Sequence, residues 1–242
     1  MVKLGKIHSR IFLIKGIFLI IMFDNIAHTY DFLNRILSFY QDLIWRNHVS
    51  KRLKNKQGIL VDVATGTADQ LIYGLKRFPN ALYAVGIDVS NEMLLRAKEK
   101  ISKNKLNGKA SLLVGDALKM PLKGNSADFV TVSFGVRNMD AEPALKEMHR
   151  ILKLNGKIII LEFSIPINSF VRHLYLLYLR NIVPVVGGSV SGNFEAYRYL
   201  SRSIEKFPYG EDFCKLMADS GFKGIKFREL SFGTATIYEG RK

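Results

Sequence analysis

Two hydrophobic periods alternate along the chain from residue 58 to residue 163. Short apolar and β-branched runs predict strands, and apolar residues that recur every three or four positions between them predict helices. The predicted strands are Ile59–Val63, Leu82–Ile87, Ala110–Val114, Asp128–Phe134 and Lys157–Phe163, and the predicted helices are Asp69–Phe78, Asn91–Asn104 and Glu142–Leu154. This alternation favours βαβ units with right-handed crossovers, and therefore an α/β fold built on a parallel sheet.

Further helices are predicted before and after this α/β segment in the sequence. Apolar spacing from Phe23 to Val49 predicts one or two helices, and Pro166 ends the alternation. The elements predicted after Pro166 are helices at Phe170–Val183, Phe194–Lys206 and Glu211–Ser220, a loop at Pro184–Asn193, and a closing strand pair at Lys223–Leu230 and Thr234–Tyr238. We expect the insert at about residues 166–208 to cover the site as a helical lid.

The N-terminal segment has a composition of its own. Ile11–Phe23 is almost entirely apolar and follows three basic residues, as in a signal peptide, but no small-residue cleavage site follows it. The run is also shorter than the roughly 20 residues that span a bilayer. Two alternatives remain, a helix packed on the domain or on a membrane, and an upstream extension with Met22 as the functional start. We expect residues 1–22 to be an extension, with 1–21 dispensable for catalysis, and residues 23–242 to form a single domain.

Composition and charge narrow the possible classes of protein. The single cysteine, Cys214, excludes a disulfide framework and a Cys-rich zinc site, and the five histidines lack metal-ligand spacing, so we expect no metal. The net charge of +15 invites an anionic partner, either a membrane surface or nucleic acid, although a solvated basic surface explains it equally well. A reducing, cytoplasmic location fits this composition.

Small and acidic residues follow the predicted strands. The turn Ala64–Thr67 lets a ligand approach the backbone, although many such turns are only tight turns. Asp88 can accept hydrogen bonds from both hydroxyls of a ribose, or it can simply favour a helix N-terminus. Asp116 and Ala117 suit an adenine amino group and ring. Because ligands bind beyond the carboxyl ends of parallel strands, we expect these residues, with Glu162 after the fifth strand, to surround a nucleoside that carries no phosphate.

Four longer motifs make the sequence similar to one family. They are Phe23-Asp24-x-Ile26-Ala27-x-x-Tyr30-Asp31-x-x-Asn34, Phe134-Gly135-Val136-Arg137-Asn138, Arg150-Ile151-Leu152-Lys153 with Leu161-Glu162-Phe163-Ser164, and Tyr197-x-Tyr199-Leu200-x-x-Ser203-Ile204 with Phe207-Pro208. With them the chain resembles class I S-adenosylmethionine (SAM)-dependent methyltransferases, and more narrowly the demethylmenaquinone/ubiquinone C-methyltransferases, from about Phe23 onward.

The resemblance implies a fold, a cofactor and a substrate class. The fold is Rossmann-like, with a mostly parallel seven-stranded sheet, helices on both faces and the helical lid insert. The cofactor is SAM, and the contacts that carry over are Thr67, Asp88, Asp116, Ala117 and Ser133. The implied reaction is methylation of a ring carbon of a polyprenylated quinol. The location implied is cytoplasmic, with peripheral contact at the inner face of the membrane. The sequence leaves open whether the protein forms a homo-oligomer.

Carbon methylation of a quinol suggests roles for two residues of the Gly-Val-Arg-Asn motif. The electron-rich ring needs a hydroxyl proton removed, so we expect Arg137 to steady the developing oxyanion and Asn138 to position a water. The alternative for Arg137 is a loop-bridging ion pair. Tyr197, His28 and Asp31 are weaker candidates, and no residue is singled out as the general base.

One departure from the family and several rival functions bear on this interpretation. Ala68 stands where the family has glycine, so its methyl group can narrow the approach to SAM. The closing Phe232-Gly233-x-x-x-Ile237-Tyr238 favours demethylmenaquinol, with a ubiquinone-pathway benzoquinol as the alternative. RNA methylation has no supporting motif, so no nucleic acid is expected, and a degenerate, non-catalytic subunit is disfavoured by Asp88, Asp116 and Arg137.

Overall fold

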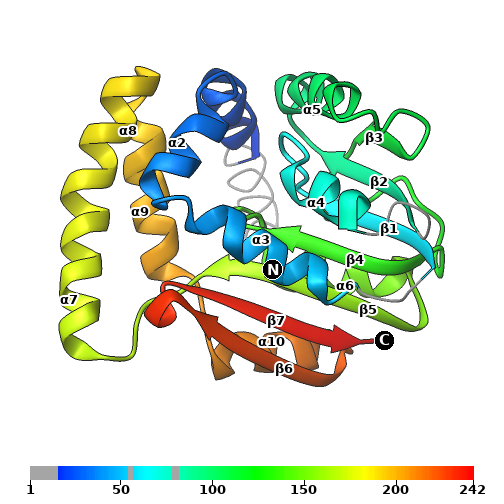
Figure 1. Cartoon of the computed structure of the whole chain (residues 1–242). Coiled ribbons are helices and arrows are strands. Elements are labelled where there is room, and N and C mark those ends of the chain that lie inside the picture. Colours follow the sequence, from blue (N-terminus) through cyan, green and yellow to red (C-terminus); the bar gives the residue numbers. More distant parts are fainter. Residues whose placement is uncertain (1–15, 54–56, 78–81) are drawn as a thin grey trace, which may run out of the picture.

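The computed structural model describes residues 16–53, 57–77 and 82–242 and contains one seven-stranded sheet (Figure 1). The strands are β1 (Gly58–Val63), β2 (Leu82–Asp88), β3 (Ala110–Val114), β4 (Ala127–Ser133), β5 (Leu152–Phe163), β6 (Lys223–Leu230) and β7 (Ala235–Arg241). Their order is β3-β2-β1-β4-β5-β7-β6, and β7 runs antiparallel to both of its neighbours while the other pairs are parallel. The predicted α/β fold with a mostly parallel seven-stranded sheet is confirmed.

Helices cover both faces of this sheet, each over its own hydrophobic core. One core contains side chains of α6 (Ala141–Ile151) and α10 (Glu211–Asp219), which lie behind the sheet in Figure 1. The other contains side chains of α3 (Gln41–Lys51), α4 (Asp69–Arg77) and α5 (Asn91–Lys103). Ser90 caps α5 as predicted, since its side chain accepts a hydrogen bond from the Met93 amide. Helices cover both faces of the sheet, as is usual for parallel strands. Because β1 to β5 run parallel, their carboxyl ends lie at the same edge of the sheet.

Strand β5 is longer than the sequence pattern predicts. Ile158–Leu161 is fully buried between β4 and β7, as expected, but the strand begins at Leu152, where the pattern predicted helix up to Leu154. Ala127 pairs with Leu152 and Phe129 with Lys157, so the extra residues form a bulge. Asn155 adopts a left-handed conformation there, which asparagine tolerates better than most residues. The helix prediction for Leu152–Leu154 was therefore wrong.

The predicted loop at Pro184–Asn193 is mostly helix. A continuous helical segment consists of α7 (Ser169–Leu177), a π-helical turn (Tyr178–Ile182) and α8 (Val183–Ser191), and α8 packs on α9 (Phe194–Lys206). Pro184 is accommodated in the first turn of α8, where its missing N–H costs little. Gly187 and Gly188 are needed for packing, because a Cβ atom would lie 2.2 Å from the Tyr197 ring or 2.3 Å from the Phe194 ring.

Substitution of Gly187 by alanine tests this close approach. We expect Gly187→Ala to lower the free energy of unfolding by about 1–3 kcal/mol, since the new methyl group overlaps the Tyr197 ring. Denaturant unfolding measures the loss. Ser189→Ala, an exposed change on the same helix, is the matched control and leaves stability nearly unchanged. Equal stability of both variants would show that α8 and α9 separate easily.

The described part of the N-terminal segment is helical from Gly16 to Ile26 and packs on the domain. Leu19 and Met22 are buried in a third hydrophobic cluster, together with side chains of α8 and α9. This helix and α2 (Tyr30–Leu37) meet at 88°. A domain boundary at residue 22 therefore falls within a helix. The dispensability of residues 1–21 stays a prediction, and residues 1–15 of that segment lie outside the described residues.

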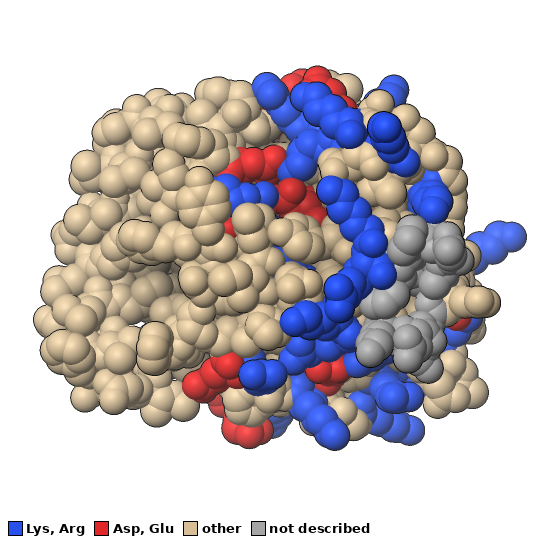
Figure 2. Space-filling model, viewed as in Figure 1, with Lys and Arg blue, Asp and Glu red and all other residues tan. Residues whose placement is uncertain are grey.

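One helical segment stands out for its apolar surface. Within the residues that the structure describes, Ser169–Ser191 is the one helix long and apolar enough to cross a membrane, and 28% of its apolar window is buried. The bent pair of Gly16–Ile26 and Tyr30–Leu37 meets the same criterion when taken together. Figure 2 shows the face over α7 and α8 without charged side chains, whereas Lys and Arg gather in a band over the sheet side of the molecule.

Candidate active site

A cavity of about 530 Å³ lies at the carboxyl ends of β1 to β4. Each of these strands is followed by residues that line the cavity, as expected at this edge of an open α/β sheet. The polar and small lining residues are Ala64, Gly66, Asp88, Gly115, Asp116, Ala117, Ser133, Gly135, Asn138 and Asp140. The segment Gly16–Phe23 closes the cavity with apolar side chains, including Ile17 and Ile20.

Asp88 is held rigidly at the end of β2. One carboxylate oxygen accepts a hydrogen bond of 2.8 Å from the Gly66 amide, and the other accepts one of 2.9 Å from the Ser90 amide. Burial raises the pKa of Asp88 above its ordinary value, against the lowering effect of these backbone donors, and nearby Asp24 raises the pKa further. Each oxygen keeps capacity for another donor, so Asp88 is suited to bind two adjacent hydroxyls.

The buried carboxylate of Asp62 holds the turn between β1 and α4 in place. Asp62 accepts hydrogen bonds of 2.6 Å from the hydroxyls of Thr65 and Thr131, and burial raises its pKa to about 6. Gly66 has a left-handed φ of 54° and open space where a Cβ would stand, so the ligand can approach its backbone. Ala68 is also left-handed, at φ 66°, but its methyl group is fully buried in the core and does not line the cavity. The methyl group therefore does not narrow the approach to the cofactor.

The other predicted cofactor contacts separate into two groups. Asp116, Ala117 and Ser133 line the cavity, and the Asp116 carboxylate also accepts a hydrogen bond from the Leu118 amide at 2.9 Å. Thr67 is buried outside the cavity lining, and its hydroxyl donates to Asp31 at 2.6 Å and accepts from Lys100 at 3.0 Å. Its part in cofactor binding stays a prediction. Glu162 is fully buried and lines neither large cavity, so it does not belong to the acids around the ligand.

A second cavity, of about 520 Å³, lies beside the first and is mainly apolar. Its wall includes side chains from the Gly16–Ile26 helix, α2, α3, α9 and the insert helix α7. From the first part of the insert, Val171, Leu174, Tyr175, Tyr178, Leu179 and Val183 line it, whereas Leu176 and Leu177 do not. From α9, Ala196, Tyr197, Tyr199, Leu200 and Ile204 line it as well. The insert therefore covers this second cavity, which agrees with its expected role as a lid over an apolar substrate.

The two cavities share part of their walls. Four residues line both of them: Phe23, Tyr30, Phe134 and Asn138. Phe134 is the residue directly after β4, with a left-handed φ of 62°, and its ring lies 4.4 Å from that of Phe163 between centroids. A nucleoside cofactor in one chamber and an aromatic substrate in the other would thus approach each other beside these four residues.

Comparison with known proteins agrees with this arrangement. The family model described as "ubiE/COQ5 methyltransferase family" matches residues 17–242. The chain belongs to this family. A ubiquinone/menaquinone biosynthesis C-methyltransferase of Geotalea uraniireducens is 43% identical over 223 residues, which are 91% of this chain and 94% of the relative. A demethylmenaquinone methyltransferase of Thermus thermophilus is 40% identical over 221 residues, or 90% and 99% of the two chains.

Membership in the ubiE/COQ5 family also corrects one expectation. The family match begins at residue 17 and not at Phe23, so it includes most of the helix that closes the cofactor cavity.

Solved structures confirm the methyltransferase fold. A SAM-dependent methyltransferase of Thermotoga maritima superposes with a TM-score of 0.65 at 20% identity, and the match covers 92% of this chain and 99% of the other. A SAM complex of a Haemonchus contortus phosphoethanolamine N-methyltransferase gives 0.59 at 16% identity, covering 84% of this chain and 52% of that one.

The Gly-Val-Arg-Asn motif of the family lies between the two cavities, because Gly135 lines the first, Arg137 the second and Asn138 both. Arg137 is nearly buried and pairs with Glu162 at 2.7 Å, and its guanidinium also donates to the Phe134 carbonyl. The alternative role of Arg137 as an ion-pair residue is thus visible in the geometry, while its catalytic role stays a prediction. Asn138 lines both cavities, and its Oδ1 is buried with no hydrogen-bond partner among the described residues, which leaves it available to a ligand or water.

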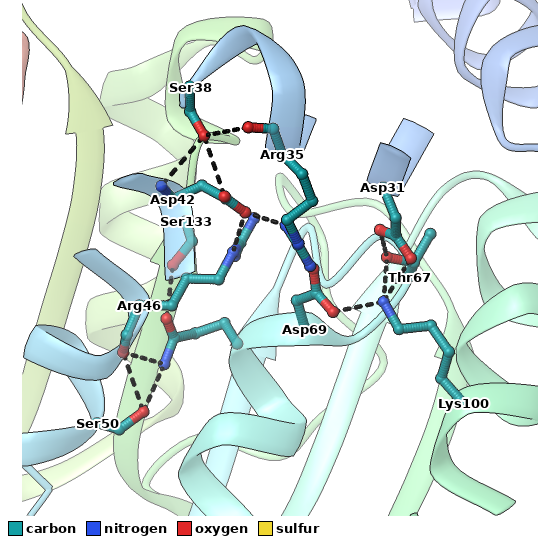
Figure 3. A network of polar contacts seen from close by, with 11 residues as sticks. Asp31, Arg35, Ser38, Asp42, Arg46, Ser50, Thr67, Asp69, Lys100 and Ser133 are labelled. Atoms are coloured by element: carbon teal, nitrogen blue, oxygen red, sulfur yellow. Dashed lines mark hydrogen bonds and ion pairs between the residues drawn. The ribbon is translucent and has the colours of Figure 1, made fainter. Parts of the chain in front are cut away.

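A chain of charged side chains ties α2 to the cofactor side of the domain (Figure 3). Arg35 pairs with both Asp42 and Asp69, and Lys100 pairs with Asp69 and with Asp31. Burial raises the pKa of Asp69, but the positive charges of Arg46, Lys100 and Arg35 outweigh this effect and hold the pKa down at about 2. The network explains why Asp31 and Thr67 point toward each other, and it fixes α2 at the shared wall of the cavities.

Two of the weaker candidates for a catalytic role, Tyr197 and His28, differ in their position relative to the cavities. Tyr197 lines the substrate cavity, but His28 is exposed and lines neither cavity. The sequence pattern also missed functional residues. Tyr30 and Arg46 line the substrate cavity, and the helix Gly16–Ile26 contributes to both chambers. Tyr30 belongs to the family motif and was available from it, whereas an arginine inside a helical pattern carries no signal of its own.

Proposed function

We propose that the protein transfers a methyl group from SAM to a ring carbon of a polyprenylated quinol, with demethylmenaquinol as the preferred substrate. The observation that carries this proposal is the mainly apolar chamber of about 520 Å³ that adjoins the cofactor chamber and has four lining residues in common with it. An isoprenoid tail needs such an apolar lining, and a nucleoside cofactor needs the acids of the other chamber. The names of the family's curated members supply the quinone class.

The cofactor chamber contains the groups that SAM requires. Asp88 offers two fixed acceptors for ribose hydroxyls, Asp116 and Ala117 suit adenine, and Ser133 and Asn138 complete the wall toward the substrate. When bound, SAM supplies a methyl group on a positively charged sulfur. The chain positions the ring against this methyl group and excludes water with the apolar side chains of the N-terminal helix and the insert.

The ring must be reduced for the reaction to proceed. Loss of a hydroxyl proton leaves an electron pair that delocalises onto the adjacent ring carbon. That carbon bonds the methyl group while the methyl–sulfur bond breaks and its electron pair stays on sulfur. Loss of the ring C–H proton and reprotonation of the oxygen restore the quinol, so one proton is released for each methyl group transferred.

The redox state of the substrate gives a direct test. Under anaerobic conditions we expect methylated product from a short-tailed demethylmenaquinol and none from the corresponding quinone, because the oxidised ring lacks the electron density to attack the methyl group. Mass spectrometry of the product measures this. A benzoquinol with the same tail is the matched control for ring specificity and is expected to react more slowly. Equal turnover of quinone and quinol without a reductant would overturn the mechanism.

The protein is also proposed to contact the membrane through α7 and α8. Phe170, Leu174, Leu177 and Val185 are each exposed by between 47% and 70%, and the first three share one helix face at spacings of four and three. The face of α7 and α8 in Figure 2 carries no charge, and the net charge of +15 favours anionic lipid. Since the insert lines the substrate chamber, this surface lies where a membrane-dissolved quinol would arrive.

Sedimentation with vesicles of phosphatidylcholine and phosphatidylglycerol tests this contact. We expect the paired change Phe170→Glu and Leu177→Glu to weaken vesicle binding by at least about tenfold, because two charges must then leave water. Neither residue lines the substrate chamber, so turnover of a short-tailed, water-soluble quinol stays close to that of the parent. Leu154→Glu, at a more exposed leucine on β5, is the control and keeps vesicle binding. Unchanged binding by the double variant would exclude this surface.

A further inference from the structure

A second arginine lines the substrate chamber, and its guanidinium has a donor without a partner. Arg46 lies on α3 with a side chain that is only 7% exposed. In the described part of the chain its Nε has no hydrogen-bond partner, and the one carboxylate within ion-pair distance is that of Asp42, 3.9 Å away. Asp42 is already engaged by Arg35 and by the Ser38 hydroxyl at 3.0 Å, as Figure 3 shows.

Arg137 provides the contrast within the same chamber. Its guanidinium donates to Glu162 and to the Phe134 carbonyl, so two of its donors are used inside the protein. The Nε atoms of both arginines lack a hydrogen-bond partner among the described residues, but the paired carboxylate lies 2.7 Å from Arg137 and 3.9 Å from Arg46. A buried cation with unused donors gains free energy when an anionic oxygen arrives, because its desolvation has already been incurred on folding.

The position of Arg46 matches the border between the two chambers. Its guanidinium carbon lies 5.3 Å from the centre of the Phe134 ring, which belongs to the shared wall. Arg137 lies over the adjoining Phe163 ring at 5.1 Å. The two guanidiniums therefore flank a contacting pair of aromatic rings where the substrate ring must meet the cofactor.

We propose that Arg46 binds the ring oxygen of the substrate and holds it as an oxyanion while the neighbouring carbon is methylated. This role rests on the proposed function and assigns to Arg46 the task that the sequence had suggested for Arg137. The ligand class that Arg46 selects is an anionic oxygen on a flat aromatic ring. The role left for Arg137 is structural: its ion pair with Glu162 holds the loop after β4 in its conformation.

A pair of probes tests the proposal without turnover. 2-Hydroxy-1,4-naphthoquinone is an anion at neutral pH, and its methyl ether is neutral with nearly the same shape. We expect the wild-type protein to bind the anion more tightly than the ether, and Arg46→Met to lose about tenfold or more in affinity for the anion alone. Arg46→Lys keeps part of the preference. Lys51→Met, which removes an exposed charge from the same helix, is the control and keeps all of it.

Kinetics and folding controls complete the test. We expect Arg46→Met to lower kcat/KM for the short-tailed quinol by about 100-fold, in line with the loss of one oxyanion donor, with the Kd for SAM unchanged. Equal loss of both probes, or no loss of either, would overturn the role of Arg46. Should Arg46→Met fail to fold, Arg46→Lys and Arg46→Gln decide by the same comparison. Failure of the wild-type protein to methylate the quinol would refute the proposed function, while the two probes still test Arg46 separately.

Discussion

Replacement of Arg137 by alanine is expected to lower the free energy of unfolding by about 3–5 kcal/mol. Glu162 is fully buried and pairs with Arg137 at 2.7 Å, so the variant leaves a carboxylate in the core without its cation. Denaturant unfolding of the parent and the variant measures the difference. The loss should be larger than that of any exposed charge reversal on the surface of the same protein.

The partner substitution separates the ion pair from the chemistry. We expect Arg137→Met combined with Glu162→Gln to recover most of the lost stability, because no buried charge is then left unpaired. If Arg137 also acts in the transition state, the stable double variant keeps a low kcat with a small change in KM. A double variant that regains both stability and kcat would restrict Arg137 to a structural role, and an Arg137→Ala protein as stable as the parent would contradict the burial argument.

Replacement of Asp88 by alanine should weaken SAM binding by roughly 2–3 kcal/mol, the scale of a charged acceptor removed from paired hydrogen bonds. That is about a 30- to 150-fold rise in Kd, which calorimetry resolves. Each oxygen of Asp88 already accepts one backbone amide, so the carboxylate is presented to the ligand in one orientation.

Two comparisons keep this experiment interpretable. Asp88→Asn keeps the shape of the side chain but turns one acceptor oxygen into an NH2 donor that faces a backbone amide, so this variant should also bind SAM more weakly than the parent. Ala68→Gly, which changes the same turn on its buried side, should leave the affinity within about twofold. A normally folded Asp88→Ala protein that binds SAM as tightly as the parent would remove Asp88 from the cofactor site.

The sheet was predictable from sequence because each strand carries its own local signal. Ala110–Val114 and Lys223–Leu230 were predicted to the residue, and Asp88 and Asp116, at the ends of β2 and β3, line one cavity as expected. Strand ends in a parallel sheet converge, so spacing along the chain was enough to group them. The family motifs added the substrate class, which no periodicity contains.

What the sequence did not predict depends on contacts between distant segments. Gly187 and Gly188 looked like a loop because their purpose, room for the rings of Tyr197 and Phe194, becomes visible only when α8 meets α9. Glu162 was grouped with the ligand acids because its strand position was known but its partner Arg137 was not. Arg46 resembled one more solvated charge on an amphipathic helix until its burial was visible.

The helix Gly16–Ile26 closes both chambers, with Ile17 and Ile20 over the cofactor side, Met22 and Ile26 over the substrate side, and Phe23 at both. Each ligand therefore contacts the same helix, and we expect the binding of one to favour the binding of the other. Calorimetric titration of SAM in the presence and absence of a short-tailed quinol measures this coupling. By linkage the effect is reciprocal: quinol should tighten the binding of SAM by the same factor by which SAM tightens the binding of quinol.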